Sequence, residues 1–336
     1  MISKGKILSK KGFTLIIIAF SGILIVGLTL LFLGYNEAFY SKNSTIQAIF
    51  KIFTFTGEAI FLVLLVSVFF FVYDKKFAKN LAFSLLISVY INSLLKSLFK
   101  DPRPQTNIDP KEEYGLIETD YGFPSGHSQN AVATWGYIAF EFKDKSSSYM
   151  IPIILSFLIL LIALSRIILG VHDLQDIIGG LLIGIVVLLL FIYLEPIISE
   201  KIGDLSIIIK IIIAISISII LFIISVLLFP KAGLGLVQNA PNYSDAGGFA
   251  QAGGAILGIS VGYILENEYI NYQPSKLDLK WKLINLILGI FLLMISYMIL
   301  ELILKGNVIL RFLRYSIISF IVIFIVPLIF KKINPK

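Results

Sequence analysis

The sequence predicts an all-α fold, a polytopic transmembrane helical bundle of about ten spans. Apolar residues fill 57% of the 336 positions, charged residues fill 15%, and the mean hydropathy is +0.93. A soluble protein of this length needs more charge to solvate its surface. The apolar residues also form blocks of about twenty, and a helix of that length spans a bilayer core of roughly 30 Å. Because cysteine is absent, disulfides and thiolate metal sites are excluded.

The expected spans follow one another along the whole chain. The first, Phe13–Leu33, follows a basic N-terminus; a cleaved signal peptide is the alternative, but the run is too long and no small-residue cleavage site ends it. Ser44–Phe55 has apolar residues at helical spacing and is either an amphipathic interfacial helix or an extension of the second span. The expected spans are residues 13–34, 57–73, 78–99, 127–142, 149–165, 173–194, 206–229, 247–266, 283–304 and 308–330.

Lysines at the ends of the spans predict the orientation, because short cytoplasmic loops are rich in Lys and Arg. With ten spans, both basic termini and three lysine-bearing loops share one side, so we expect a multi-pass protein of the cell membrane with cytoplasmic termini. These lysines beside anionic headgroups account for the net charge of +7, and nucleic-acid binding is not expected. They are Lys4, Lys6, Lys10, Lys11, Lys75, Lys76, Lys79, Lys143, Lys145, Lys276, Lys280, Lys282, Lys331, Lys332 and Lys336.

Three polar clusters interrupt the apolar pattern, and in this topology all three fall on the extracytoplasmic side. Basic residues on that side depart from the charge bias, as residues retained for binding an anion would. The clusters are Lys96 with Arg103 and Pro104; Phe123, Pro124, Ser125, Gly126 and His127; and Ser165 and Arg166 with His172 and Asp176.

The residue types in these clusters suit a phosphate ester. Lys96 supplies a point charge, and Arg103 and Arg166 supply planar forks that match phosphate oxygens. We call these three side chains the cation trio. The Ser125 hydroxyl and the amides of Ser125 and Gly126 are further candidate donors, because glycine permits close backbone approach at the start of a helix.

The chain has two histidines, His127 and His172, and each lies in one of these clusters. His172 and Asp176 are one helical turn apart, so the carboxylate can accept the proton of one imidazole nitrogen and leave the other to attack phosphorus. Asp173 points about 100° away and suits the helix N-terminus as a cap. Histidine inside a membrane protein is costly and by default indicates function.

In order and spacing, the clusters resemble the signature of the type-2 phosphatidic acid phosphatase superfamily: Lys-x6-Arg-Pro, Pro-Ser-Gly-His and Ser-Arg-x5-His-x3-Asp. By this resemblance, His172 is the nucleophile that forms a phosphohistidine, oriented by Asp176. His127 protonates the leaving group and then activates water. The cation trio, Ser125 and Gly126 bind the phosphate and stabilise its transition state. The resemblance implies no metal and no other cofactor.

The resemblance covers roughly residues 57–195 and, with the first span, matches the family's six-helix membrane core. We therefore expect this core at residues 1–200, with its motifs at 96–176, and a four-helix membrane extension of unknown role at 201–336. The extension carries a stripe of small residues that permits close helix packing, either within the chain or in a homodimer. The stripe is formed by Gly254, Gly258 and Gly262.

The expected function is an integral membrane phosphatase that acts on a lipid phosphate monoester or diphosphate at the extracytoplasmic face. Its partners would be the lipid phosphate and the surrounding membrane lipids; a polyprenyl diphosphate, a phosphatidate-like lipid and a sphingoid-base phosphate remain alternatives. A phosphotransferase with the same site is a second hypothesis. A non-enzymatic lipid transporter or flippase is a third, but the polar residues gather near one face and no inverted repeat is evident.

Overall fold

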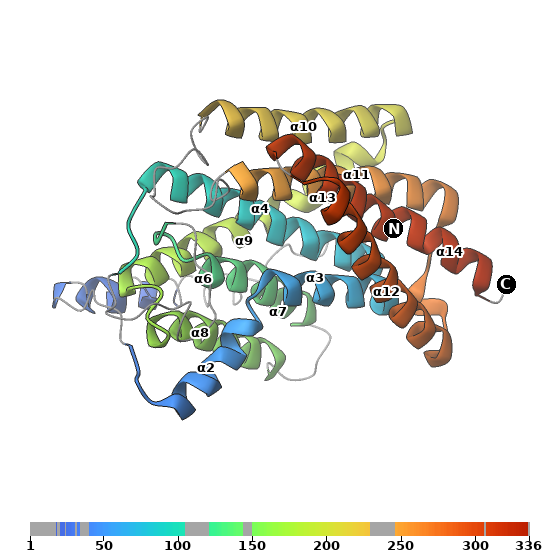
Figure 1. Cartoon of the computed structure of the whole chain (residues 1–336). Coiled ribbons are helices and arrows are strands. Elements are labelled where there is room, and N and C mark those ends of the chain that lie inside the picture. The colour runs from blue at the N-terminus through green and yellow to red at the C-terminus, as the bar shows by residue number, and fades with distance from the viewer. Residues whose placement is uncertain are drawn as a thin grey trace. The chain divides into compact units, whose positions relative to one another are not determined.

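The computed structural model describes residues 40–104, 121–143, 150–228, 246–305 and 307–334, with part of the first apolar segment between residues 18 and 33. Every regular element in these ranges is a helix, which confirms the all-α class (Figure 1). Short π-helical turns interrupt several of the helices. The basic N-terminus with Lys4 to Lys11, Lys145 and Lys336 lie outside the described residues.

The elements follow in this order: α2 (Ser44–Phe55), α3 (Ala59–Val68), η1 (Phe69–Tyr73), α4 (Lys75–Phe99), α6 (Gly126–Ala131), η2 (Val132–Gly136), α7 (Tyr137–Phe142), α8 (Met150–Ile168), α9 (Leu174–Gly203), α10 (Ile207–Leu228), α11 (Ala246–Leu265), η3 (Glu266–Ile270), η4 (Pro274–Lys276), α12 (Leu279–Ile303), α13 (Val308–Phe320), η5 (Ile321–Ile325) and α14 (Val326–Ile333).

Seven described helices are long and apolar enough to cross a membrane, and there are eight if α2 and α3 form one broken span. The chain is therefore a multi-pass membrane protein. The expected span 127–142 is helical but shorter than these seven, and the expected span 13–34 lies only partly within the described residues. α2 is bent by 48° from the helix that follows it, so Ser44–Phe55 does not extend the second span in a straight line.

The chain divides into two compact units. Unit 1 comprises Met1–Glu58 and Leu95–Ser199, and unit 2 comprises Ala59–Leu94 and Glu200–Lys336. The division follows contacts in space rather than chain order, because α3 and most of α4 belong to the same unit as the C-terminal helices. The expected division into residues 1–200 and 201–336 stays a prediction.

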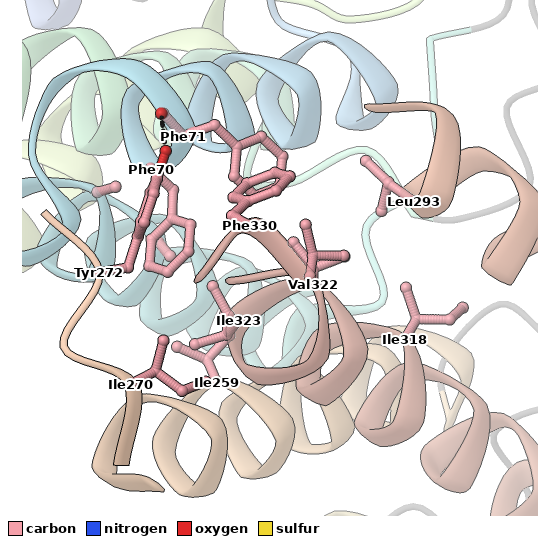
Figure 2. Close-up of a cluster of buried hydrophobic side chains, with 13 residues drawn as sticks. Phe70, Phe71, Ile259, Ile270, Tyr272, Leu293, Ile318, Val322, Ile323 and Phe330 are labelled. Carbon is pink, nitrogen blue, oxygen red and sulfur yellow. Dashed lines mark hydrogen bonds between the residues drawn. The ribbon is translucent and has the colours of Figure 1, made fainter. Parts of the chain in front are cut away.

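Unit 2 has an apolar core in which aromatic side chains from distant segments meet (Figure 2). Phe330 of α14 lies between Phe71 and Tyr272, with ring centroids 5.5 and 5.4 Å away. The Tyr272 hydroxyl donates a hydrogen bond of 2.7 Å to the Phe71 carbonyl, so the polar end of this buried ring is satisfied. Ile259 and Val322 extend the core along α11 and η5.

The glycine stripe of α11 packs against α13 and η5 within unit 2. A Cβ atom at Gly254 or Gly258 would collide with backbone carbonyl oxygens of α13, and one at Gly262 would lie 3.2 Å from the Cβ of Ile323. The stripe therefore serves close helix packing inside the chain. A homodimer through these glycines is not supported, because α13 and η5 already cover them.

A buried ion pair joins the start of α4 to η3 in unit 2. The Lys75 Nζ lies 2.7 Å from a carboxylate oxygen of Glu266, whose side chain is fully buried. The other carboxylate oxygen accepts the Tyr272 amide at 2.6 Å. Asn271, which links η3 to Tyr272, has φ 53° and so lies in the left-handed region. Its side-chain oxygen accepts a longer hydrogen bond of 3.3 Å from Lys75.

Candidate functional site

All the residues singled out for phosphate chemistry belong to unit 1, and all lie at or near helix ends. Lys96 is in the last turn of α4, Arg103 follows that helix, and the Ser125 to His127 segment opens α6. Arg166 is in the last turn of α8, and His172 and Asp176 flank the start of α9. Side chains that are far apart in the sequence therefore share one unit.

The turn between Arg166 and His172 explains the spacing of the third motif. Gly170 has φ 73°, a conformation that suits glycine, and its amide donates to the Ile167 carbonyl at 2.9 Å. The amides of Val171 and His172 both donate to the Arg166 carbonyl, at 3.1 and 3.2 Å. This is a Schellman-type helix end. The five residues between Arg166 and His172 are thus the length of one helix-terminating turn.

His172 is held by a contact at each ring nitrogen. Its Nδ1 lies 2.7 Å from the Oδ2 atom of Asp176, and both side chains are buried. Its Nε2 lies 3.2 Å from the Nη1 atom of Arg103, whose guanidinium also donates to the Val171 carbonyl at 2.9 Å. Since a guanidinium can only donate, these contacts assign the proton to Nδ1 and leave the lone pair on Nε2.

The surroundings of His172 also favour its neutral form. Burial, followed by the positive charges of Arg103, Lys96 and Arg166, lowers the pKa of His172 well below its usual value of 6.5. His127 adds a smaller effect in the same direction. The whole cation trio and the second histidine therefore lie close enough to act on the His172 imidazole, which is poised as a neutral nitrogen base.

Asp173 caps the helix that carries Asp176. The amide of Asp176 donates to the Asp173 Oδ1 atom at 2.9 Å, as in a capped helix N-terminus. The Asp173 amide in turn faces the Asp176 Oδ2 atom at 3.4 Å. Burial raises the pKa of Asp173 above its usual range. The two carboxylates thus have separate contacts, with Asp173 on the helix end and Asp176 on the imidazole.

The start of α6 is fixed against α9. The Ser125 amide donates to the Asp176 carbonyl at 2.9 Å, so this amide is engaged by the protein, whereas the sequence suggested it as a phosphate donor. The Ser125 Oγ accepts from Ser128 as the helix cap. The Gly126 amide, at the first position of α6, has no acceptor within the helix and remains a candidate donor. A Cβ at Gly180 would lie 2.6 Å from the Ser125 carbonyl, so glycine permits this approach.

The other two members of the cation trio are buried and hydrogen-bonded. Lys96, 5% exposed, donates to the carbonyl oxygens of Tyr121 and Gly122. Arg166 is fully buried, and its Nη1 atom donates to the Thr54 hydroxyl at 3.2 Å. Burying a cation is costly unless it is paired and hydrogen-bonded, so these positions indicate a functional demand for positive charge.

Sequence reasoning missed the contribution of the turn that follows α2. The Ser165 hydroxyl donates to the Ile162 carbonyl at 2.6 Å, so the Thr54 hydroxyl is the donor in its 2.6 Å bond to Ser165. Arg166 donates to the same Thr54 oxygen. A residue outside the motifs therefore holds two adjacent motif residues through one hydroxyl group.

Gly57 and Glu58 extend this turn to His127. A Cβ at Gly57 would lie 3.0 Å from the Cδ2 atom of His127, so only glycine leaves the ring this space. The Glu58 Oε1 atom lies 3.1 Å from the Nε2 atom of His127. Glu58 is the one acidic residue in the sequence between Glu37 and Asp74, a signal that could have singled it out. Among the described residues, no group of three or more His, Asp and Glu side chains is arranged to hold a metal ion.

Comparison with known proteins gives two family matches. The model of the PAP2 superfamily matches residues 77–198, and the model of the transmembrane extension of PAP2 superfamily phosphatases matches residues 250–336. The first match contains all three polar clusters, and the second contains the glycine stripe.

Curated relatives carry phosphatase names. The chain is 28% identical to lipid phosphate phosphatase delta of Arabidopsis thaliana, over 38% of this chain and 32% of that protein. It is 29% identical to a dihydrosphingosine 1-phosphate phosphatase of Schizosaccharomyces pombe, over 45% and 38%. It is 32% identical to phosphatidylglycerophosphatase B of Bacillus subtilis, over 30% and 49%. The chain thus spans about a third to a half of the length of these relatives. This membrane protein therefore carries a PAP2 superfamily domain and the transmembrane extension of PAP2 superfamily phosphatases, in agreement with the family signature that its motifs resemble.

Proposed function

We propose that the protein is an integral membrane phosphatase that removes phosphate from a lipid phosphate monoester or diphosphate through a phosphohistidine on His172. One observation carries the proposal: the buried His172 donates its Nδ1 proton to Asp176 and directs its Nε2 lone pair toward Arg103. A neutral nitrogen nucleophile beside fixed cations is what attack on a phosphate ester needs.

In the first half-reaction, the Nε2 atom of His172 attacks phosphorus while the bond from phosphorus to the leaving oxygen breaks. His127 gives its proton to that oxygen, so a lipid alcohol leaves from a monoester and a lipid monophosphate leaves from a diphosphate. The cation trio and the Gly126 amide bind the nonbridging oxygens, whose charge is redistributed in the transition state. Asp176 stabilises the positive charge that develops on His172.

In the second half-reaction, water attacks the phosphohistidine. His127, now neutral, takes a proton from that water, and the bond between phosphorus and Nε2 breaks as inorganic phosphate forms. His172 returns to its neutral form, with the proton still on Nδ1 and hydrogen-bonded to Asp176. A phosphotransferase would differ only in replacing water by an acceptor alcohol.

The helix ends that carry the site support a lipid substrate at the extracytoplasmic face. The clusters lie where α4 and α8 end and where α6 and α9 begin, so an acyl or prenyl chain can stay in the bilayer while its headgroup reaches the cations. Lys75 begins α4, Lys201 is in the last turn of α9, and Lys143 follows α7, which continues from α6 through η2; each therefore lies at the helix end away from the site, as expected for cytoplasmic ends. The names of the relatives favour monoesters among the candidate substrates.

Phosphate release from the purified protein in detergent tests the proposal. The substrates are phosphatidate, dihydrosphingosine 1-phosphate, phosphatidylglycerophosphate and a polyprenyl diphosphate. We expect release from at least one lipid and loss of release in His172→Ala. In His127→Ala, an acid-labile phosphoenzyme should accumulate from 4-nitrophenyl phosphate, whose leaving group does not need a proton. Activity retained in His172→Ala would exclude the phosphohistidine, and lipid movement across vesicles without phosphate release would favour the transporter.

The orientation and the domain division need separate tests. A membrane-impermeant phosphate substrate, offered to sealed right-side-out vesicles, should be hydrolysed if the site faces the outside. Expression of residues 1–200 and 201–336 as two chains should give a phosphatase only when the first piece is present. Hydrolysis restricted to inverted vesicles would contradict the proposed topology.

A further inference from the structure

We propose that Glu58 is a positioning residue for His127, so that the site contains a second pair of carboxylate and imidazole. The Glu58 Oε1 atom lies 3.1 Å from the Nε2 atom of His127, and the two side chains are 38% and 18% exposed. The pair of Asp176 and His172 is buried and closer, at 2.7 Å. The two histidines therefore each contact a carboxylate, but in different surroundings.

The backbone of Glu58 is fixed relative to the motif residues. The Gly57 amide donates to the Thr54 carbonyl at 2.9 Å, and the Glu58 amide donates to the Phe55 carbonyl at 3.1 Å. Thr54 is itself bonded to Ser165 and Arg166 through its hydroxyl. A tight turn, anchored on the third motif, thus presents the carboxylate to the histidine of the second motif.

Gly57 lets the two side chains meet. Its Cα lies so close to the His127 ring that a Cβ would be 3.0 Å from the ring carbon Cδ2 and 3.1 Å from a methyl group of Ile162. The ring therefore packs flush against the turn, with Glu58 at its edge. Packing and hydrogen bonding together limit the orientations open to His127.

The electrostatic need for Glu58 follows from the other charges around the site. The cation trio and His127 all lie close enough to His172 to act on its imidazole, so His127 shares a region of positive charge, and positive charge disfavours a further proton on an imidazole. Asp176 is engaged by His172. Glu58 is the carboxylate in contact with His127, so it favours the protonated imidazole that must give a proton to the leaving oxygen.

These different surroundings give the two histidines opposite protonation states. Burial and cations keep His172 neutral for attack, while a partly exposed carboxylate stabilises the protonated His127. The inference rests on the proposed phosphatase function and adds to it a residue outside the three motifs.

The test measures kcat/KM against pH for Glu58→Gln, with Glu141→Gln in α7 as the matched control, because Glu141 belongs to the same unit but not to the site. A lipid or alkyl phosphate has a poor leaving group that needs a proton, whereas 4-nitrophenyl phosphate has a good one. We expect about a tenfold loss with the alkyl substrate in Glu58→Gln and a much smaller loss with the aryl substrate.

The pH profile supplies a second readout. Loss of the carboxylate should move the alkaline limb of kcat/KM about one unit toward lower pH, because the protonated imidazole loses its opposite charge. Glu58→Asp, which keeps the charge, should restore the limb. In Glu58→Ala, added formate should return activity toward the wild-type level, and this measurement decides the question if the Gln variant does not fold.

Three results would overturn the inference: no change in Glu58→Gln, an equal loss for both substrates at every pH, or no rescue by Asp or formate. An equal loss would mean that Glu58 only supports the fold. Failure of the proposed function looks different, since wild-type protein would then release no phosphate or His172→Ala would remain active. The two failures are therefore distinguishable.

Discussion

The two units of the chain differ most in what they bury. In unit 1 the fully buried side chains include Arg166, His172 and Asp176, all polar and all near helix ends. In unit 2 the largest of them are aromatic rings such as Phe71 and Phe330, with Glu266 as a charged exception. Burying charge costs free energy that apolar packing of the same volume does not. The difference indicates that unit 1 keeps its polar interior for chemistry, while unit 2 is organised by packing.

The contacts that define each unit differ in the same way. In unit 1, hydrogen bonds at helix termini place the reactive groups, as with the Arg166 carbonyl that receives the amides of Val171 and His172. In unit 2, glycines allow α11 to lie directly against α13. Substitutions in unit 1 should therefore change activity more than stability, and substitutions in unit 2 should do the reverse.

The largest expected effect is on activity, in Asp176→Asn. The amide keeps the volume of the carboxylate but removes the charge that holds the Nδ1 proton and stabilises His172 in the transition state. We expect kcat for phosphate release to fall by about 10³- to 10⁴-fold with little change in the melting temperature. Asp173→Asn is the matched control, since it alters only the helix cap. A fall in both variants of similar size would contradict the assignment of separate roles.

The next effect is on stability, in Glu266→Gln. This change leaves the Lys75 ammonium, whose side chain is 13% exposed, without its counter-charge and should lower the free energy of unfolding by about 3–5 kcal/mol. The pH profile of kcat should stay as in wild type. The double variant Lys75→Met with Glu266→Met should recover most of the lost stability, as measured by equilibrium unfolding in mixed micelles. A double variant as unstable as the single one would show that the ion pair is not the cause.

A smaller loss of stability is expected in Gly258→Ala. The added Cβ meets backbone rather than a flexible side chain, so α11 and α13 must separate, at a cost of about 1–3 kcal/mol. Gly203→Ala, where no neighbouring atom lies within 4 Å, is the control and should be close to neutral. Thermal unfolding measures both. Equal melting temperatures in the two variants would argue against tight packing at the stripe.

The smallest expected effect concerns the acidic limb of the plot of kcat/KM against pH. His172 acts as a neutral base, and its pKa in the protein lies below 6.5 because of burial and the cation trio. Activity should therefore persist as pH falls through 6.5 and decline only at lower pH. A stopped assay with 4-nitrophenyl phosphate measures the limb while reducing the demand for an acid. An acid limb above 6.5 would show that the surroundings of His172 do not favour the neutral form.

Much of the site was accessible from the sequence because polar residues are conspicuous in an apolar chain. The clusters around Lys96, His127 and His172 belong to one compact unit, while their shared extracytoplasmic face stays a prediction. The sequence does not predict roles for Thr54 and Glu58, because each is a single residue outside any spacing pattern. Their contacts depend on the turn after α2, which is seen only in the folded structure. The hydrogen bond from the Ser125 amide to the Asp176 carbonyl is likewise a tertiary contact, which the rules for helix ends do not predict.

The fold shows the same limit. Hydropathy locates the long helices, since burial in lipid requires runs of apolar residues. It does not reveal that α2 and the next helix are bent by 48°, because both sides of the break are apolar. Nor does it pair Lys75 with Glu266, which are 191 residues apart and look like ordinary ends of spans. Local sequence patterns predict the helices, but polar pairs between distant residues are found only from the folded structure.

The helix-terminating turn at Gly170 fixes the number of residues between Arg166 and His172, because the imidazole reaches Asp176 only with a turn of this length. An inserted or deleted residue between Arg166 and His172 would rotate the imidazole away from Asp176 even if every side chain were kept. Homologous chains should therefore align through this segment without gaps, whatever their divergence elsewhere. A gap at this point is then a practical criterion for setting aside a superfamily member as catalytically inactive.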